Sequence, residues 1–138
     1  MDNNTADKIT GSLSLFLRIG FYIFYIPFLE KEYGLKEFLD TLSKGKKKSF
    51  NKILIKRYVH VWLKIKSIFK TQHCWNRTMI LYKFLNESGY NAVLYTGIRK
   101  DRIDKISIIG HSWVCIDGVV FDDQPDISNH YHITFSYP

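Results

Sequence analysis

The sequence of 138 residues has few of the residues that staple or interrupt small proteins, with 2 cysteines and 3 prolines. Two cysteines, Cys74 and Cys115, do not make a disulfide framework. Hydrophobic residues form 46% of the chain, which is enough apolar mass for a core without staples. The composition therefore excludes a disulfide-rich scaffold and predicts one compact domain.

A secretory signal is also missing, because the N-terminal "MDNNTADKIT" has neither a basic n-region nor a small-residue cleavage site. With only two cysteines, the chain is predicted to be cytoplasmic. The apolar run 13–29 is short for a membrane span, which needs about 20 residues. It also carries Arg18 and Pro27. We interpret it as a buried or interfacial helix and keep weak membrane association as the alternative.

Acidic residues are absent from 44–70 and basic residues from 117–126, although the net charge is +7. A basic segment early in the chain and an acidic segment late in it favour charge complementarity within the protein or a basic docking face for a partner. Lys46, Lys47 and Lys48 are the candidate docking residues, and a solvated helix face is the alternative. Zinc-finger, helix-turn-helix and aromatic-interleaved basic motifs are absent, so no nucleic-acid partner is expected.

The first half of the chain has helical periodicity and predicts a helical N-terminal part, residues 1–70. After the apolar run, 35–44 predicts a short helix, and a longer helix follows the lysine run. Apolar residues recur in that longer helix at steps of three and four, which predicts a core-facing stripe. The stripe consists of Phe50, Leu54, Tyr58, Val61, Trp62, Ile65 and Phe69.

The second half, residues 71–138, has a different pattern. A helix is predicted over 72–87, ending before Gly89 as a C′ glycine would dictate. A strand is predicted at 91–98, and two more strands flank Asp117-Gly118, a dipeptide that favours a tight hairpin. The tail from Ile127 is ambiguous and could hold a last strand. Helices followed by antiparallel strands predict an α+β fold.

Cys74 is a candidate nucleophile because of its position in the predicted 72–87 helix. With Thr71 as the N-cap, Cys74 lies in the first turn. Free backbone N–H groups and the positive end of the helix dipole favour thiolate over thiol there. The same groups could donate to an oxyanion. The alternative is that Cys74 is a buried apolar filler.

A thiolate nucleophile needs a base, and the base needs a third group that orients it. His111 opens the first strand of the predicted hairpin, and Asp122 and Asp123 follow the second strand. A two-residue turn would place Asp122 on the face of His111, whereas a longer turn or a bulge would place Asp123 there. Alternation favours Asp122, because Asp-Gly is the usual two-residue signal, but leaves both open.

Other candidate sites carry less chemistry. Cys115 lies in an apolar strand and is interpreted as a packing residue. His130 and His132 share one face of the possible last strand, but no cysteine or acidic partner stands at ligand spacing, so no metal is expected. A glycine-rich phosphate loop is also absent, and no cofactor is predicted.

Residues 72–126 resemble the transglutaminase-like core of lasso-peptide biosynthesis B proteins, which are leader peptidases. The strength of the resemblance lies in the joined pattern and not in any single residue. Ser112 departs from it where alanine is common, and Cys115 departs where an acidic or other polar residue is common. The matching residues are Cys74, Arg77, Gly89, His111, Trp113, Asp117-Gly118 and Asp123.

The resemblance implies a transglutaminase-like, papain-like core in which Cys74, His111 and Asp123 form the triad of a cysteine peptidase. The family places the acidic residue at the second of the paired positions, so Asp122 is held in reserve. Gln72 is a candidate side-chain donor to the oxyanion. The implied partners are the precursor peptide, a separate RiPP recognition element protein that captures the leader, and the ATP-dependent macrolactam cyclase that acts next.

Two other functions stay open. The first is acyl transfer to an amine on the same fold, and the mass of the product would separate it from hydrolysis. The second is a non-catalytic basic module that binds a peptide, nucleic acid or membrane. It predicts no selective thiol labelling of Cys74 and full function in Cys74→Ala.

Overall fold

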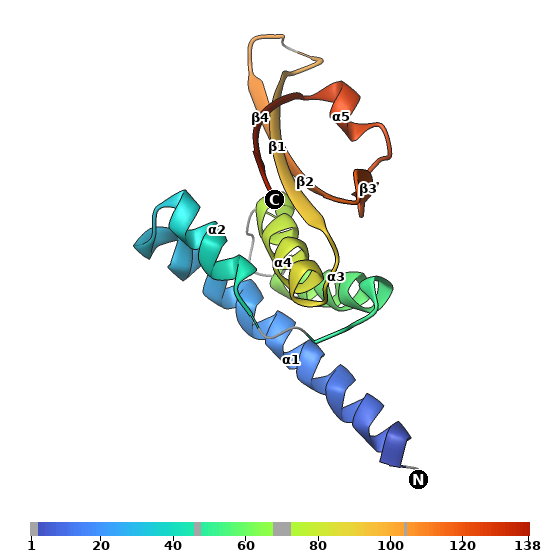
Figure 1. Ribbon diagram of the computed structural model, residues 1–138. Coiled ribbons are helices and arrows are strands. Elements are labelled where there is room, and N and C mark those ends of the chain that lie inside the picture. Colours follow the sequence, from blue (N-terminus) through green and yellow to red (C-terminus); the bar gives the residue numbers. More distant parts are fainter. Residues whose placement is uncertain (1–2, 46–47, 68–72, 104) are drawn as a thin grey trace.

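The computed structural model of the protein describes residues 3–45, 48–67, 73–103 and 105–138. Helices come first and strands second, with one short helix before the last strand (Figure 1). The elements are α1 (Asn3–Glu32), α2 (Leu35–Ser43), α3 (Lys52–Ser67), α4 (His73–Glu87), β1 (Ala92–Lys100), β2 (Ile108–Ile116), β3 (Val119–Phe121), α5 (Ile127–His130) and β4 (His132–Tyr137). The predicted α+β class is confirmed.

The sheet has the strand order β3-β2-β1-β4, and each neighbouring pair is antiparallel. Asp117 and Gly118 connect β2 to β3 with φ angles of 50° and 80°, and Ile116 pairs directly with Val119. These angles are those of a type I′ turn, so the two-residue turn predicted from Asp-Gly is confirmed. The strand that carries His111 begins earlier than expected, at Ile108, and His111 lies within it.

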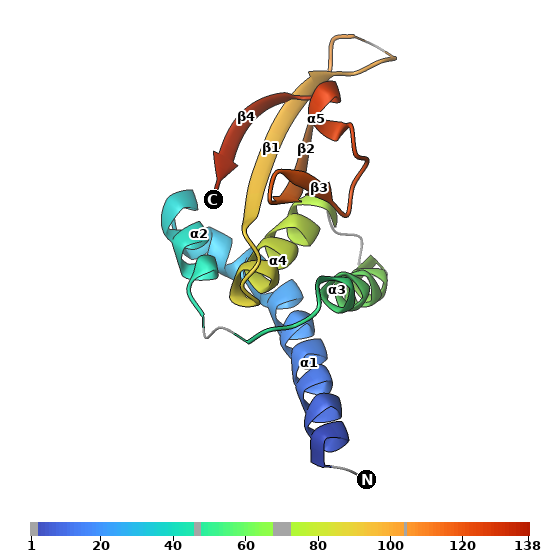
Figure 2. The same ribbon diagram turned by 45° about the vertical axis from the view of Figure 1, so that its right-hand side comes forward.

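The two faces of the sheet bury different clusters because side chains alternate along each strand. One face packs on the helices (Figure 2). Its buried strand residues are Ala92, Leu94, Val114 and Ile116. The other face packs on α5, where Trp113 and Cys115 meet Ile127.

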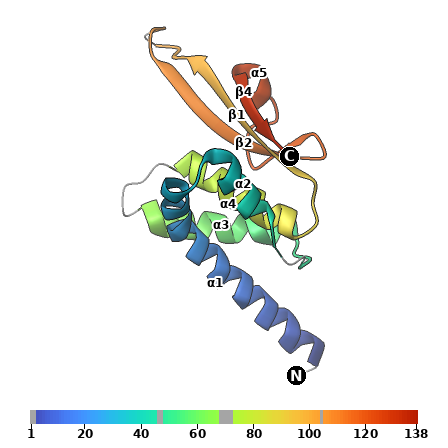
Figure 3. The ribbon, with the colours of Figure 1, turned by 60° about the vertical axis from the view of Figure 1, so that its left-hand side comes forward.

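Helix α4 is the central helix, in contact with α1, α2 and α3 and with strands β1 and β2 (Figure 3). Apolar residues on all sides of it are therefore buried, among them Met79, Tyr82 and Phe84 at 0% exposure. Gly89 follows its end with φ of 88°, as the C′ position predicts. The predicted N-cap, Thr71, lies outside the described residues.

The stripe predicted for the third helix is only partly core. The buried residues of α3 are Ile55, Val59, Leu63 and Lys66, about one position away from the predicted stripe. Tyr58 and Trp62 pack beside them against Phe16 of α1, whereas Val61 and Ile65 are exposed. The reason is that α3 contacts both α1 and α4, so its buried face is turned toward α4. Phe69 lies outside the described residues.

The apolar run 13–29 belongs to a longer helix than the sequence indicated. Within α1, the segment Lys8–Glu32 has 25 residues and is long and apolar enough to cross a membrane by length and composition. The prediction that it is too short was therefore wrong. Only 28% of its most apolar window is buried, so α1 also differs from an ordinary core helix.

The tail from Ile127 forms both a helical turn and a strand. His130 ends α5, and His132 begins β4. The expectation that these histidines share one strand face was wrong. His130 instead bonds Asp126, with 2.9 Å between Nε2 and Oδ2.

Candidate active site

Cys74 is the second residue of α4, so it lies in the first helical turn as predicted. The thiol is free and partly buried. At this end of a helix the first backbone N–H groups have no intrahelical carbonyl partner. Cys74 therefore stands next to N–H groups that no carbonyl of the helix accepts, and at the positive end of the helix dipole.

Cys74 and His111 line the same cleft, which has a volume of about 600 Å³. The cleft lies where the start of α4 meets the sheet. Its walls are formed by Cys74 and Trp75 of α4, by Thr96, Gly97 and Ile98 of β1, by Gly110, His111 and Ser112 of β2, and by Thr134 of β4. A sulfur and an imidazole thus line one open cleft.

A buried hydroxyl pair ties α4 to β2 next to these two residues. The Thr78 hydroxyl lies 2.9 Å from the carbonyl oxygen of Cys74 and 3.0 Å from that of Ser112. Ser112 Oγ donates to Thr78 Oγ1 at 3.1 Å. Thr78 is 1% exposed and Ser112 is 2% exposed. Because water cannot compete for these groups, the bonds fix the turn that carries Cys74 relative to the strand that carries His111.

Asp123 is bound to the imidazole of His111. His111 Nε2 donates to Asp123 Oδ2 at 2.7 Å, and Arg77 donates to the same oxygen at 2.9 Å. The other oxygen, Oδ1, accepts the backbone N–H of Gln124 at 2.8 Å. The side chains of His111 and Asp123 are 20% and 11% exposed. Since a carboxylate only accepts, Nε2 holds the hydrogen, and Nδ1 of a neutral His111 is left as the basic nitrogen.

Asp122 points away from His111, contrary to the alternation argument. The turn has two residues, as that argument required, but β3 ends at Phe121 and Asp122 has φ of 61°. This left-handed residue bends the chain and breaks the alternation of side chains. The Asp122 carboxylate instead contacts α3, with Lys56 Nζ at 3.0 Å and His60 Nε2 at 2.7 Å.

The remaining predicted residues do not join this site. Gln72, Lys46 and Lys47 lie outside the described residues. Lys48 is exposed, and its backbone N–H donates to the carbonyl oxygen of Glu87 at 3.2 Å. Cys115 is 5% exposed in the cluster under α5, and burial raises the pKa of its thiol. It is therefore a packing residue, as predicted.

Sequence reasoning missed the roles of four residues near the site. Thr78 follows Cys74 by one helical turn, a spacing that could have indicated contact with the same partner strand. Arg77 was noted only as part of a motif. Lys56 and His60 had no local signal, because Asp122, which both contact, comes 62 residues after His60 in the sequence. Within the described ranges, no group of three or more histidine, cysteine, aspartate or glutamate residues could hold a metal ion.

A model of a known protein family matches the part of the chain that carries this site. A family model described as "Transglutaminase-like superfamily" matches residues 43–136, which include α3, α4, β1, β2, β3 and all of β4 except its last residue. The match covers more than half of the chain. Searches of curated proteins and of solved structures found no match.

Proposed function

Given that the chain belongs to the transglutaminase-like superfamily, whose members are typically Cys–His–Asp enzymes of the cysteine protease or acyl-transferase kind, we propose that it is a cysteine peptidase. Its substrate would be a ribosomally made lasso-peptide precursor, from which it removes the leader. The observation that carries the proposal is the shared cleft of Cys74 and His111, with Asp123 bound to Nε2 of the imidazole.

The chemistry follows the positions of these groups. His111 Nδ1 takes the proton of the Cys74 thiol, and Asp123 holds the imidazolium that forms. The sulfur attacks the carbonyl carbon at the leader–core junction, and backbone N–H groups at the start of α4 stabilise the oxyanion. The imidazolium then gives its proton to the nitrogen of the breaking amide, which leaves as the new N-terminus of the core peptide.

Water completes the cycle. His111 removes a proton from a water molecule, whose oxygen attacks the thioester that joins the leader to Cys74. The C–S bond breaks, the leader leaves with a free carboxyl group, and the sulfur regains its proton. The reaction consumes one water for each precursor and needs no cofactor.

The leader assignment is supported by the residue pattern of 72–126 and by the lining of the cleft. In the lasso-peptide B proteins that the sequence resembles, the leader has a threonine near its end. Thr96, Gly97 and Thr134 give one wall of the cleft small side chains, which leaves room for an extended backbone and a side chain of that size.

The proposed partners are the precursor, a separate RiPP recognition element protein that binds the leader, and the ATP-dependent macrolactam cyclase that uses the freed amine, all in the cytoplasm. The basic segment with Lys46, Lys47 and Lys48 would dock the recognition protein. Charge reversal of these three lysines should weaken that association. Unchanged affinity in a pull-down titration would reject this docking site.

Acyl transfer to an amine is the second candidate, because the superfamily includes both outcomes and the same thioester serves each. The two differ in the mass of the released leader. Hydrolysis adds one water to the leader acyl group, whereas transfer adds the amine.

The experiment is mass spectrometry of a candidate precursor incubated with the protein, with and without the leader-binding partner. We expect cleavage by the wild type and no cleavage by Cys74→Ala or His111→Ala, with unchanged circular dichroism. Cys115→Ala is the matched control, because it removes the other thiol and should still cleave. Wild-type rates in either active-site variant would make the assignment of the triad wrong.

A further inference from the structure

One face of α1 exposes a row of large apolar side chains, called here the α1 stripe. Its members follow one another at helical steps of one, three and four residues and extend over about 22 Å at 1.5 Å per residue. They are Leu13, Leu17, Phe21, Phe24, Tyr25 and Phe28, with exposed fractions of 57%, 57%, 60%, 42%, 41% and 66%. Within 13–29 the only charged residue is Arg18, which is paired with Glu87 at 2.6 Å.

An apolar groove lies between the stripe and α3. It has a volume of about 430 Å³ and is lined by Gly20, Phe21, Phe24, Tyr25, Phe28 and Trp62. Gly20 is required here, since a Cβ at this position would overlap the ring of Trp62. The Trp62 Nε1–H already donates to the carbonyl oxygen of Phe16 at 2.8 Å, so it is not available to a partner. Val61 and Ile65, neighbours of Trp62 on α3, are 44% and 39% exposed and add to the apolar surface.

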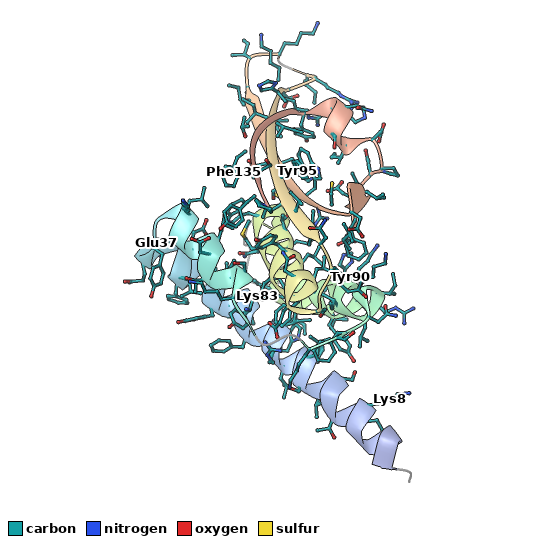
Figure 4. All side chains as sticks on the ribbon, viewed as in Figure 1. Lys8, Glu37, Lys83, Tyr90, Tyr95 and Phe135 are labelled. Carbon is teal, nitrogen blue, oxygen red and sulfur yellow. The ribbon has the colours of Figure 1, made fainter. Side chains whose placement is uncertain are left out.

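The stripe is accessible along its length, because each of its members is at least 41% exposed. In all three ribbon views the N-terminal half of α1 extends beyond the other helices. Figure 4 shows Lys8 at the outer end of this extension, far from the sheet. Exposed apolar surfaces of this kind mark contacts with a partner protein or a membrane.

The charges nearby and the lack of polar groups favour a membrane over a protein. A protein interface has about one hydrogen bond per 100–200 Å², whereas the Tyr25 hydroxyl is the only side-chain donor that the stripe offers. Lys8, which lines a pocket with Leu13, and Lys31, one turn beyond Phe28, are exposed, and neither forms an ion pair within the part of the chain that the structure describes. With a net charge of +7, these cations suit anionic headgroups.

We propose that the α1 stripe and its groove bind the surface of an anionic lipid bilayer, with α1 lying in the plane of the interface. A spanning orientation does not fit, because the opposite face of α1 belongs to the protein core. Leu15, Ile19 and Ile23 are 0% exposed there, and the Arg18–Glu87 pair joins α1 to α4. The described acidic side chains of α1, Glu30 and Glu32, come after the last residue of the stripe. This geometry is that of an interfacial helix whose polar side is replaced by a folded domain.

The test is vesicle flotation of the full chain, which needs no peptide substrate and is independent of the proposed peptidase activity. Vesicles contain either phosphatidylglycerol mixed with phosphatidylcholine or phosphatidylcholine alone. The variant Phe21→Ser/Phe28→Ser removes two exposed rings of the stripe. The control Ile103→Ser/Ile108→Ser removes two side chains that are 94% and 67% exposed at the far end of the sheet.

The wild type and the control should float with the anionic vesicles and bind phosphatidylcholine more weakly. The stripe variant should bind about a hundredfold more weakly, since burying each phenylalanine contributes about tenfold. Failure of the wild type to float with the anionic vesicles, or equal binding to both compositions, would overturn the proposal. So would equal binding by the stripe variant. A dimer in light scattering that the stripe variant dissociates, without vesicle binding, would assign the face to a second copy instead.

Discussion

Replacement of Asp122 should loosen the turn that delivers Asp123 to His111. Asp122 has φ of 61°, and its carboxylate is bound by Lys56 and His60 of α3. Two separate effects thus hold this turn, a backbone conformation and a pair of contacts. Substitution by Asn, Gly and Ala separates them, because Asn and Gly tolerate the left-handed conformation and Ala does not.

The size of each effect follows from exposure. The Asp122 side chain is 5% exposed, whereas those of Lys56 and His60 are 39% and 44% exposed. When Asp122 is replaced, water can therefore take over much of the hydrogen bonding that Lys56 and His60 made to its carboxylate. We expect the pair of contacts to contribute about 1–2 kcal/mol, below the usual value for buried charge-assisted bonds. The left-handed conformation adds about 1 kcal/mol for Ala. Unfolding free energies should therefore fall by about 1 kcal/mol for Asn, about 2 for Gly and about 3 for Ala.

Urea denaturation measures these losses, and single-turnover cleavage of the precursor measures the effect on the site. If the proposed peptidase activity holds, Asp122→Ala should cleave about tenfold more slowly, because Cys74, His111 and Asp123 are present but Asp123 is less well held. Asp123→Asn should be slower by about a hundredfold or more, and Asp122→Asn should be affected less than Asp123→Asn. Asp117→Asn is the matched control, since Asp117 has φ of 50° in an exposed turn. Equal stability of the Ala and Gly variants would exclude the backbone effect, and wild-type cleavage by all three would show that this turn does not position Asp123.

Two further substitutions test the structure around the cleft and the helical core. In Gly97→Ala the new Cβ would lie 2.9 Å from the carbonyl oxygen of His132, so the melting temperature should fall by an amount equivalent to about 2 kcal/mol. The control Gly110→Ala meets nothing within 4 Å and should leave the melting temperature unchanged. Equal losses in the two variants would contradict the close approach at Gly97. Glu87→Gln removes the carboxylate that pairs with both Arg18 and Lys83, of which Lys83 has 4% side-chain exposure, and should cost about 3 kcal/mol near pH 7. The pKa of Lys83 is lowered chiefly by burial, so the native state binds fewer protons than the unfolded state. The loss of unfolding free energy in Glu87→Gln should therefore shrink as the pH rises toward 10.5. A loss that is constant with pH in urea titrations would contradict this.

The sequence predicted the elements whose signals are local. The helix of Cys74, its end at Gly89 and the hairpin at Asp117-Gly118 depend on neighbouring residues, and each is confirmed. The presence of His111 on the strand of that hairpin follows from the same local pattern.

The choice between Asp122 and Asp123 could not be made from alternation. It depends on a left-handed residue that is bound by α3, and α3 is far from this turn in the sequence. The resemblance of the motif to a known family indicated Asp123 as the acidic residue, and the structure binds Asp123 to His111. A pattern of residue types thus carried tertiary information that the spacing of residues did not.

The helical half was predicted less well, because burial there depends on how many neighbours a helix has. Helix α3 contacts two helices and buries a face about one position away from the predicted stripe. Helix α1 has apolar residues on both sides, but its neighbours cover only one of them. Periodicity alone does not reveal which apolar face lacks a partner.

If His111 activates Cys74 as a nucleophile, the alkylation rate of Cys74 should exceed that of an ordinary thiol. Iodoacetamide labelling near neutral pH, followed by peptide mass spectrometry, reports Cys74 and Cys115 in the same sample. We predict that Cys74 reacts at least about tenfold faster than a free cysteine, that Cys115 stays unlabelled in the native protein, and that His111→Ala slows Cys74 selectively. Labelling of Cys74 at the rate of an ordinary thiol, unchanged in His111→Ala, would show that His111 does not activate Cys74.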